Sequence, residues 1–129
     1  MQIEMTIQGL MVDPVTNMPI VVLRDESGEH SLPIWVGVFE ANAIALQIEN
    51  ITPPRPMTHD LLRNVISNFS GTVEKVVISE LKESTFYAFV YIRIGEQVSI
   101  VDSRPSDAIA LALRVGAPIF AEESVVEYA

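Results

Sequence analysis

The segment Asp102-Ser103-Arg104-Pro105-Ser106-Asp107-Ala108-Ile109-Ala110-Leu111-Ala112-Leu113-Arg114 joins a predicted strand to an apolar helix, which we expect from Pro105 to Val115. Its polar part places a guanidinium beside carboxylates at a helix start. Free backbone N–H groups at such a position favour anions. The segment therefore predicts a largely buried helix preceded by a site for a phosphate, for a carboxylate or for the helix's own acidic side chain.

A second Arg-Pro cluster, Arg55-Pro56-Met57-Thr58-His59-Asp60, leads into another apolar stretch. We expect a helix from Thr58 to Phe69, with Thr58 as N-cap and Gly71 as the stop signal. At 100° per residue, one side of this helix carries Leu61, Leu62, Val65, Ile66 and Phe69, and the other carries His59, Asp60 and Arg63. We expect the apolar side to face the core and the polar side to face away from it.

The remaining chain predicts an α+β domain. Alternation and turn residues indicate strands at Ile3–Val12, Pro19–Leu23, Ser31–Val36, Thr72–Lys82, Thr85–Ile94 and Gln97–Asp102, and helices at Gly37–Asn50 and Glu122–Tyr128. Ala43-Ile44-Ala45-Leu46 recurs as Ala108-Ile109-Ala110-Leu111 after the third strand of each half. We therefore expect two pseudo-equivalent halves, each a three-stranded, mainly antiparallel sheet followed by a helix, with an additional connecting helix.

Composition limits the organisation of the protein. At 129 residues and 49% hydrophobic content, the chain suits one domain, residues 1–129, with one sizeable core. A mean hydropathy of +0.32 is high for a small domain, so we expect homo-oligomers. The sequence has no cysteine for disulfides or thiolate ligands and no apolar run long enough to span a bilayer. We expect a cytoplasmic protein with no membrane partner.

The formal charge of −9 argues against a protein that coats DNA, because it repels a polyanion at long range. Six of the eight basic residues are arginines, and Arg55, Arg63, Arg104 and Arg114 lie in or just after the two clusters. A local positive site on an acidic body is therefore still compatible with the sequence.

The two clusters, together with Glu40-Ala41-x-Ala43-Ile44 and Pro118-Ile119, closely resemble the bifunctional nuclease domain of bacteria and plants over nearly the whole chain. The resemblance implies a compact α+β fold that self-associates and an activity that degrades both RNA and DNA. It supplies no established catalytic set.

Phosphodiester hydrolysis needs an activated water and stabilisation of charge on phosphoryl oxygens, which divalent metals held by carboxylates commonly supply. The candidate catalytic residues are His59, Asp60, Asp102 and Asp107, and the candidate substrate-binding residues are Arg55, Arg104 and Arg114. The candidate ligands for Mg²⁺ or Mn²⁺ are Glu40, Asp60 and Asp107, with Asp102 as a further oxygen donor and His59 as an additional ligand or general acid–base group.

Each of these residues also has a structural interpretation. Asp60 and Asp107 stabilise helix starts in any protein, and Asp102 and Arg104 can pair with each other or with Arg55 and Asp60. The sequence therefore leaves two further functions open. One is a non-enzymatic anion-binding or regulatory assembly module, and the other is a hydrolase of a small phosphorylated metabolite.

Overall fold

One seven-stranded mixed sheet runs through the protein, whose computed structural model describes residues 1–128. The strands are β1 (Gln2–Val12), β2 (Pro19–Asp25), β3 (Ser31–Trp35), β4 (Gly71–Lys82), β5 (Thr85–Ile94), β6 (Gln97–Ser103) and β7 (Ile119–Glu122). Their order in the sheet is β3-β2-β1-β7-β4-β5-β6. The α+β prediction is confirmed, and every expected strand is present with its ends shifted by one or two residues at most.

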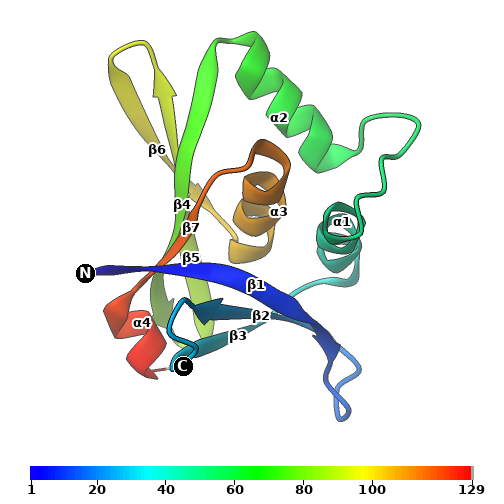
Figure 1. Ribbon diagram of the computed structural model, residues 1–129, viewed down its shortest axis with the longest axis vertical. Coiled ribbons are helices and arrows are strands. Elements are labelled where there is room, and N and C mark those ends of the chain that lie inside the picture. The colour runs from blue at the N-terminus through cyan, green and yellow to red at the C-terminus, as the bar shows by residue number, and fades with distance from the viewer. Residues whose placement is uncertain (129) are drawn as a thin grey trace.

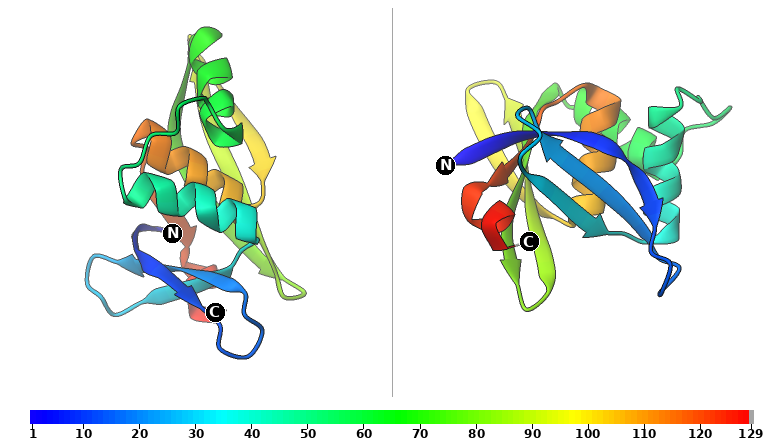
Figure 2. Two further views of the ribbon diagram at one scale, coloured as in Figure 1. Left: turned by 90° about the vertical axis from the view of Figure 1, so that its right-hand side faces the viewer. Right: turned by 60° about the horizontal axis from the view of Figure 1, so that its bottom comes forward.

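Four helices accompany the sheet: α1 (Val38–Ile48), α2 (Thr58–Asn68), α3 (Pro105–Val115) and α4 (Glu123–Tyr128). The first three lie on one side of β4–β6, with α3 in contact with both α1 and α2 (Figures 1 and 2). α4 contacts β4 and β7 and lies across these strands from α3 (Figure 1). None of the described helices is long and apolar enough to cross a membrane. Residue 129, the end of the expected domain, lies outside the described residues.

β7 joins the two three-stranded units into a single sheet. It pairs antiparallel with β1 and parallel with β4, with Ile119 opposite Met5 on one side and Val76 on the other. No strand is expected at these residues from the sequence, and each half is expected to form a sheet of its own. The structure has one seven-stranded sheet instead, so two pseudo-equivalent halves are not observed. A parallel pair needs a crossover connection, and the segment containing β5, β6 and α3 supplies it.

The core lies between the sheet and α3. Ala108, Ile109 and Ala110 have no exposed surface, and they pack with buried strand residues such as Val76 and Ile78. Three of the buried residues of α3 are small alanines, Ala108, Ala110 and Ala112, so this helix can approach the sheet closely and be covered by α1 and α2. Gly116 ends the helix in the left-handed conformation at φ 71°, which glycine adopts without steric cost. α3 is therefore the central, fixed element to which the site is attached.

α2 is turned away from the orientation expected from its sequence, although Ile66 of its apolar side still packs against the core. His59 and Asp60 are buried, whereas Leu61, Val65 and Phe69 are exposed. The reason is that the polar side chains of the first turn find charged partners on α3, and these contacts turn the more apolar side outward. The N-cap is also Met57 and not Thr58.

Candidate functional site

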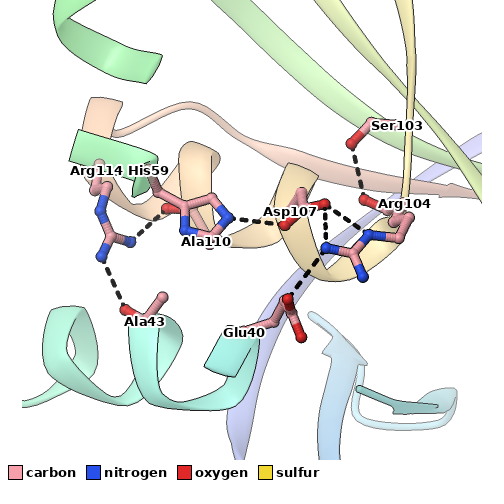
Figure 3. A network of polar contacts seen from close by, with 8 residues as sticks. All are labelled: Glu40, Ala43, His59, Ser103, Arg104, Asp107, Ala110 and Arg114. Carbon is pink, nitrogen blue, oxygen red and sulfur yellow. Dashed lines mark hydrogen bonds and ion pairs between the residues drawn. The ribbon is translucent and has the colours of Figure 1, made fainter. Parts of the chain in front are cut away.

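Four charged or titratable side chains from three helices and the end of a strand form a continuous chain of contacts, which we call the charged cluster: Glu40, Arg104, Asp107 and His59 (Figure 3). Glu40 lies in the first turn of α1, His59 in the first turn of α2 and Asp107 in the first turn of α3. Arg104 is the N-cap residue of α3, directly after β6. The two Arg-Pro segments thus meet, as the site prediction requires.

The contact between His59 and Asp107 joins α2 to α3. His59 Nε2 lies 2.8 Å from Asp107 Oδ1, and the histidine side chain is only 10% exposed. Burial raises the pKa of Asp107, but hydrogen bonds from His59 and Arg104 and the charge of Arg104 outweigh it, so the pKa is lowered. Asp107 is therefore an ionised acceptor at neutral pH, and it fixes the direction of the imidazole ring.

Arg104 connects Asp107 to α1. Its Nε donates to Asp107 Oδ2 at 2.8 Å, and its Nη2 donates to Glu40 Oε2 at 3.1 Å. These two hydrogen bonds raise the pKa of the Arg104 guanidinium, so it keeps its charge. Its side chain is still 65% exposed, and Nη1 has no hydrogen-bond partner among residues 1–128. The guanidinium can therefore bind an anion without leaving its carboxylates.

Gly37 makes room for the Glu40 carboxylate. A Cβ atom built at position 37 would collide with the Glu40 side chain, which folds back over the start of α1. Because Gly37 is also the N-cap residue of α1, the helix and the carboxylate are positioned together. Glu40 is thus placed to hold Arg104.

A second ion pair, Asp60 with Arg114, lies in the contact between α2 and α3. Arg114 Nε donates to Asp60 Oδ1 at 2.8 Å, while Nη1 and Nη2 donate to the backbone oxygens of Ala110 and Ala43 at 2.8 and 3.1 Å. The Arg114 side chain is 1% exposed. One guanidinium thus ties three helices together, so we assign Asp60 and Arg114 to support of the site.

Asp60 also stabilises the start of its own helix. Its Oδ2 accepts the Met57 N–H at 3.0 Å, and this bond is the leading cause of its lowered pKa. Burial opposes the shift, and the hydrogen bond and charge of Arg114 lower the pKa further. Asp60 therefore stabilises the start of its helix as expected, but its ion-pair partner is Arg114 and not the expected Arg104.

Two predicted site residues lie apart from these contacts. Asp102 is exposed near the end of β6, and Arg104 pairs with Glu40 and Asp107 and not with Asp102. Arg55 is exposed in the segment between α1 and α2, and in the described chain it has no hydrogen bond or ion pair with the charged cluster. Arg104 therefore does not form the expected pair with Asp102 or Asp60, and Asp102 does not form the expected pair with Arg55. Arg104 pairs instead with Glu40 of α1 and Asp107 of α3.

A cavity of about 740 Å³ opens beside the charged cluster. Glu40, His59, Asp102, Arg104 and Asp107 all contribute to its lining. Much of the rest is apolar and comes from α2, α3, β5 and β6. A cavity of this size with a few convergent polar groups is typical of small-ligand and active sites.

Comparison with known proteins identifies the family of this chain. Residues 21–129 match the model of the bifunctional nuclease domain. The chain belongs to the bifunctional nuclease domain family. It is 44% identical over 126 residues to an uncharacterized protein of Mycobacterium tuberculosis strain H37Rv. The aligned residues cover 98% of this chain and 75% of that protein.

Two rice proteins are more distant relatives of this bifunctional nuclease domain. Bifunctional nuclease 1 of Oryza sativa subsp. indica is 28% identical over 110 residues, or 83% of this chain and 33% of its own length. Bifunctional nuclease 2 of Oryza sativa subsp. japonica is 28% identical over 122 residues, or 92% of this chain and 38% of its own length. The chain therefore spans little more than a third of these plant proteins, and their names describe longer molecules.

Residues 1–128 do not form a preformed site for the expected divalent cation. Among residues 1–128, no three His, Asp or Glu side chains are grouped so that they could hold a metal ion. Asp60 is engaged with Arg114, and the Arg104 guanidinium bridges Glu40 and Asp107. Glu40, Asp60 and Asp107 therefore do not form a shared ligand set, and the chemistry below uses the chain's own groups.

The cavity is the part of the site that sequence reasoning misses. Its walls include Val90, Ile92 and Val101, which alternate along strands and suggest ordinary core positions. The signal that could have indicated it is the strand β6, where almost every residue is exposed although Val98, Ile100 and Val101 are apolar. Apolar residues on an incompletely covered strand indicate a surface with a partner or a ligand.

Proposed function

We propose that this domain hydrolyses phosphodiester bonds of RNA and DNA at the charged cluster. The observation that carries the proposal is the 2.8 Å contact of a buried histidine with an ionised aspartate, beside an exposed arginine at the mouth of a cavity. Family membership supports the same chemistry. The set offers a general base, a group that orients it and a phosphate ligand.

The proton positions follow from the contact. An ionised carboxylate only accepts hydrogen bonds, so His59 Nε2 carries the proton that Asp107 Oδ1 accepts. In the neutral imidazole, His59 Nδ1 is then the unprotonated nitrogen and can act as a base. Asp107 holds this tautomer and stabilises the imidazolium that forms when Nδ1 takes up a proton.

In the proposed reaction, His59 Nδ1 accepts a proton from a water molecule while the water oxygen attacks the phosphorus atom. The bond between phosphorus and the leaving sugar oxygen breaks, and that oxygen takes a proton from solvent. Arg104 binds the non-bridging phosphate oxygens through Nη1 and stabilises their charge. The products are a phosphomonoester and a free hydroxyl, and solvent returns His59 to its neutral state.

Single-turnover cleavage of RNA, single-stranded DNA and double-stranded DNA by highly purified protein tests this proposal. His59→Asn should lower the rate about 10²–10⁴-fold, the range for loss of a general acid–base group. The matched control is His30→Asn, because His30 is exposed beside β3. Equal rates for the two variants would remove His59 from the mechanism.

Two further arms test the supporting roles. Arg104→Lys keeps the charge but loses the planar fork, so we expect weaker substrate binding with a smaller effect on the rate at saturation. Assays with Mg²⁺, with Mn²⁺ and with EDTA test whether a cation carried by the substrate phosphate takes part. Circular dichroism and melting curves must match the parent for each variant used.

The cavity also favours a second candidate, a hydrolase or binding module for a small phosphorylated ligand. A net charge of −9 disfavours an extended nucleic-acid track, whereas a small anion needs only the Arg104 guanidinium. If this candidate is correct, the parent protein binds or hydrolyses a mononucleotide or a phosphorylated metabolite. It then cleaves oligonucleotides no faster than the His59→Asn variant does. The assay above distinguishes the two.

A further inference from the structure

The walls and the rim of the cavity differ in chemistry. Leu62 and Ile66 of α2, Leu111 of α3, and Val90, Ile92 and Val101 of the sheet form apolar walls. The charged cluster and Asp102 also line the cavity. The carboxylates of Glu40, Asp102 and Asp107 therefore lie near the Arg104 guanidinium. A ligand that binds here must therefore combine an anionic group at Arg104 with an uncharged, largely apolar group inside.

The charge distribution decides what can enter beyond Arg104. Glu40, Asp102 and Asp107 repel a second phosphate, so an extended polyphosphate or a phosphorylated sugar with two anionic groups does not suit the cavity. The apolar walls themselves offer no partner to the hydroxyls of a sugar, and burial of a hydroxyl without a partner is costly. A planar ring with apolar faces and a polar edge meets both conditions.

Polar and aromatic groups for such a ring are present at the cavity. Asn42 of α1 and Thr58 of α2 contribute to the lining, and their side chains can donate to and accept from the edge of a ring. Phe39, 85% exposed at the start of α1, also borders the cavity and offers a face for stacking. Stacking on an aromatic side chain accepts any base, because every base has a π-face.

We propose that this cavity is a subsite for one unpaired nucleobase of a polynucleotide whose neighbouring phosphate is bound by Arg104. The inference rests on the proposed function, and it specifies the substrate class as single-stranded or locally unpaired nucleic acid. A base held in a duplex is stacked and paired, so it can enter only after it leaves the helix, at a cost in free energy.

Binding of two probes tests the subsite directly. 2-Aminopurine deoxyribonucleoside 5′-monophosphate carries the base and the phosphate, and deoxyribose 5-phosphate carries the phosphate alone. Calorimetry should give at least about tenfold tighter binding of the first probe, the effect expected from one stacked base. Equal affinities would overturn the proposal.

Variants on the two faces of β6 provide a matched pair. Val101 lines the cavity and pairs with Val90, whereas Ile100 pairs with Tyr91, and the strand's alternation places it on the opposite face. Val101→Phe fills the cavity and should weaken mononucleotide binding by about tenfold or more, while Ile100→Phe should leave it unchanged. Both positions are exposed on an edge strand, so both variants should fold.

Phe39→Ala removes the stacking face without touching the core and should weaken mononucleotide binding several-fold while leaving deoxyribose 5-phosphate unaffected. Unchanged mononucleotide binding in both Val101→Phe and Phe39→Ala would overturn the subsite. The occupants to test next would then be a segment of a second copy of the chain and a hydrophobic peptide. This variant also covers the case in which Val101→Phe is destabilised.

Cleavage assays separate the subsite from the proposed function. If the subsite is correct, the parent should cleave single-stranded DNA faster than the same sequence in a duplex, and Val101→Phe should reduce this preference. Equal cleavage of both forms, dependent on His59 but not on Val101, would reject the subsite and retain the hydrolase. Tight, base-dependent binding without His59-dependent cleavage would reject the hydrolase and retain the subsite.

Discussion

The Arg114 guanidinium and the Asp60 carboxylate, 54 positions apart in the chain, form a 2.8 Å ion pair whose side chains are 1% and 12% exposed. The same guanidinium donates to backbone oxygens of Ala110 and Ala43. The pair therefore sets the relative positions of α1, α2 and α3. His59 directly precedes Asp60, so the placement of the proposed base depends on this pair.

Loss of the Arg114 charge should destabilise the fold strongly. Arg114→Met leaves Asp60 as a buried carboxylate without its partner, so we expect the free energy of unfolding to fall by about 3–5 kcal/mol. The control is Arg93→Met, which breaks the exposed Arg93–Glu74 pair and should cost less than about 1 kcal/mol. Urea denaturation measures both values, and similar losses in the two variants would show that Arg114 is not a buried support.

Acid should weaken the same helix contacts. The pKa of Asp60 is lowered by the Met57 N–H bond and by Arg114, and that of Asp107 by His59 and Arg104 despite burial. A carboxylate whose folded pKa lies below its unfolded value stabilises the fold above the unfolded value, near about 3.9. This stability is lost as the pH falls through the folded pKa. We therefore expect the free energy of unfolding to decline below about pH 4.

Asp60→Asn isolates one part of this pH dependence. Its stability deficit relative to the parent should be largest near neutral pH and should shrink as the pH falls below about 4, because the parent then loses its own carboxylate charge. Urea unfolding at a series of pH values measures the difference. A deficit that stays constant over this range would show that the Asp60 charge contributes nothing to stability.

Asp102 should be dispensable for stability. The sequence-based hypothesis of a buried partner predicts a loss of about 1–3 kcal/mol for Asp102→Ala. In the structure Asp102 is exposed and Arg104 pairs elsewhere, so we now expect a change within about 0.5 kcal/mol. Asp107→Ala, by contrast, removes the carboxylate that joins His59 to Arg104 and should lower the melting temperature. Equal melting temperatures for the two variants would contradict this contrast.

Most secondary structure was predictable because its signals are local. Pro105 to Val115 is helical in both the prediction and the structure, and the β5 bounds also agree. β7 was not predictable in the same way, because its four residues pair with strands far along the chain and give no clear alternation. A short strand held from both sides depends on partners that a local pattern does not specify.

The meeting of the two Arg-Pro segments was predictable, but the contacts between their side chains were not. The sequence indicates that both Arg-Pro segments carry the chemistry, and the structure brings His59, Asp107, Arg104 and Glu40 together. It does not indicate which acid pairs with which arginine, because distances across the fold decide that. The amphipathic pattern of α2 also misleads, since a polar side that finds buried partners can face the core.

The exposed apolar side of α2 predicts that the protein self-associates. Leu61 and Val65 are exposed on α2, and Phe69 is exposed directly after it. The mean hydropathy of the chain is +0.32. Contiguous apolar surface on a small domain favours burial against a second copy. Analytical ultracentrifugation should give a mass above the 14.3 kDa of one chain, and Phe69→Glu should shift the distribution toward that value.

Val15→Glu, which adds the same charge in the exposed turn between β1 and β2, should leave the parent mass unchanged. A parent that stays monomeric at high concentration, or that responds equally to both substitutions, would show that this side of α2 does not bind a second copy.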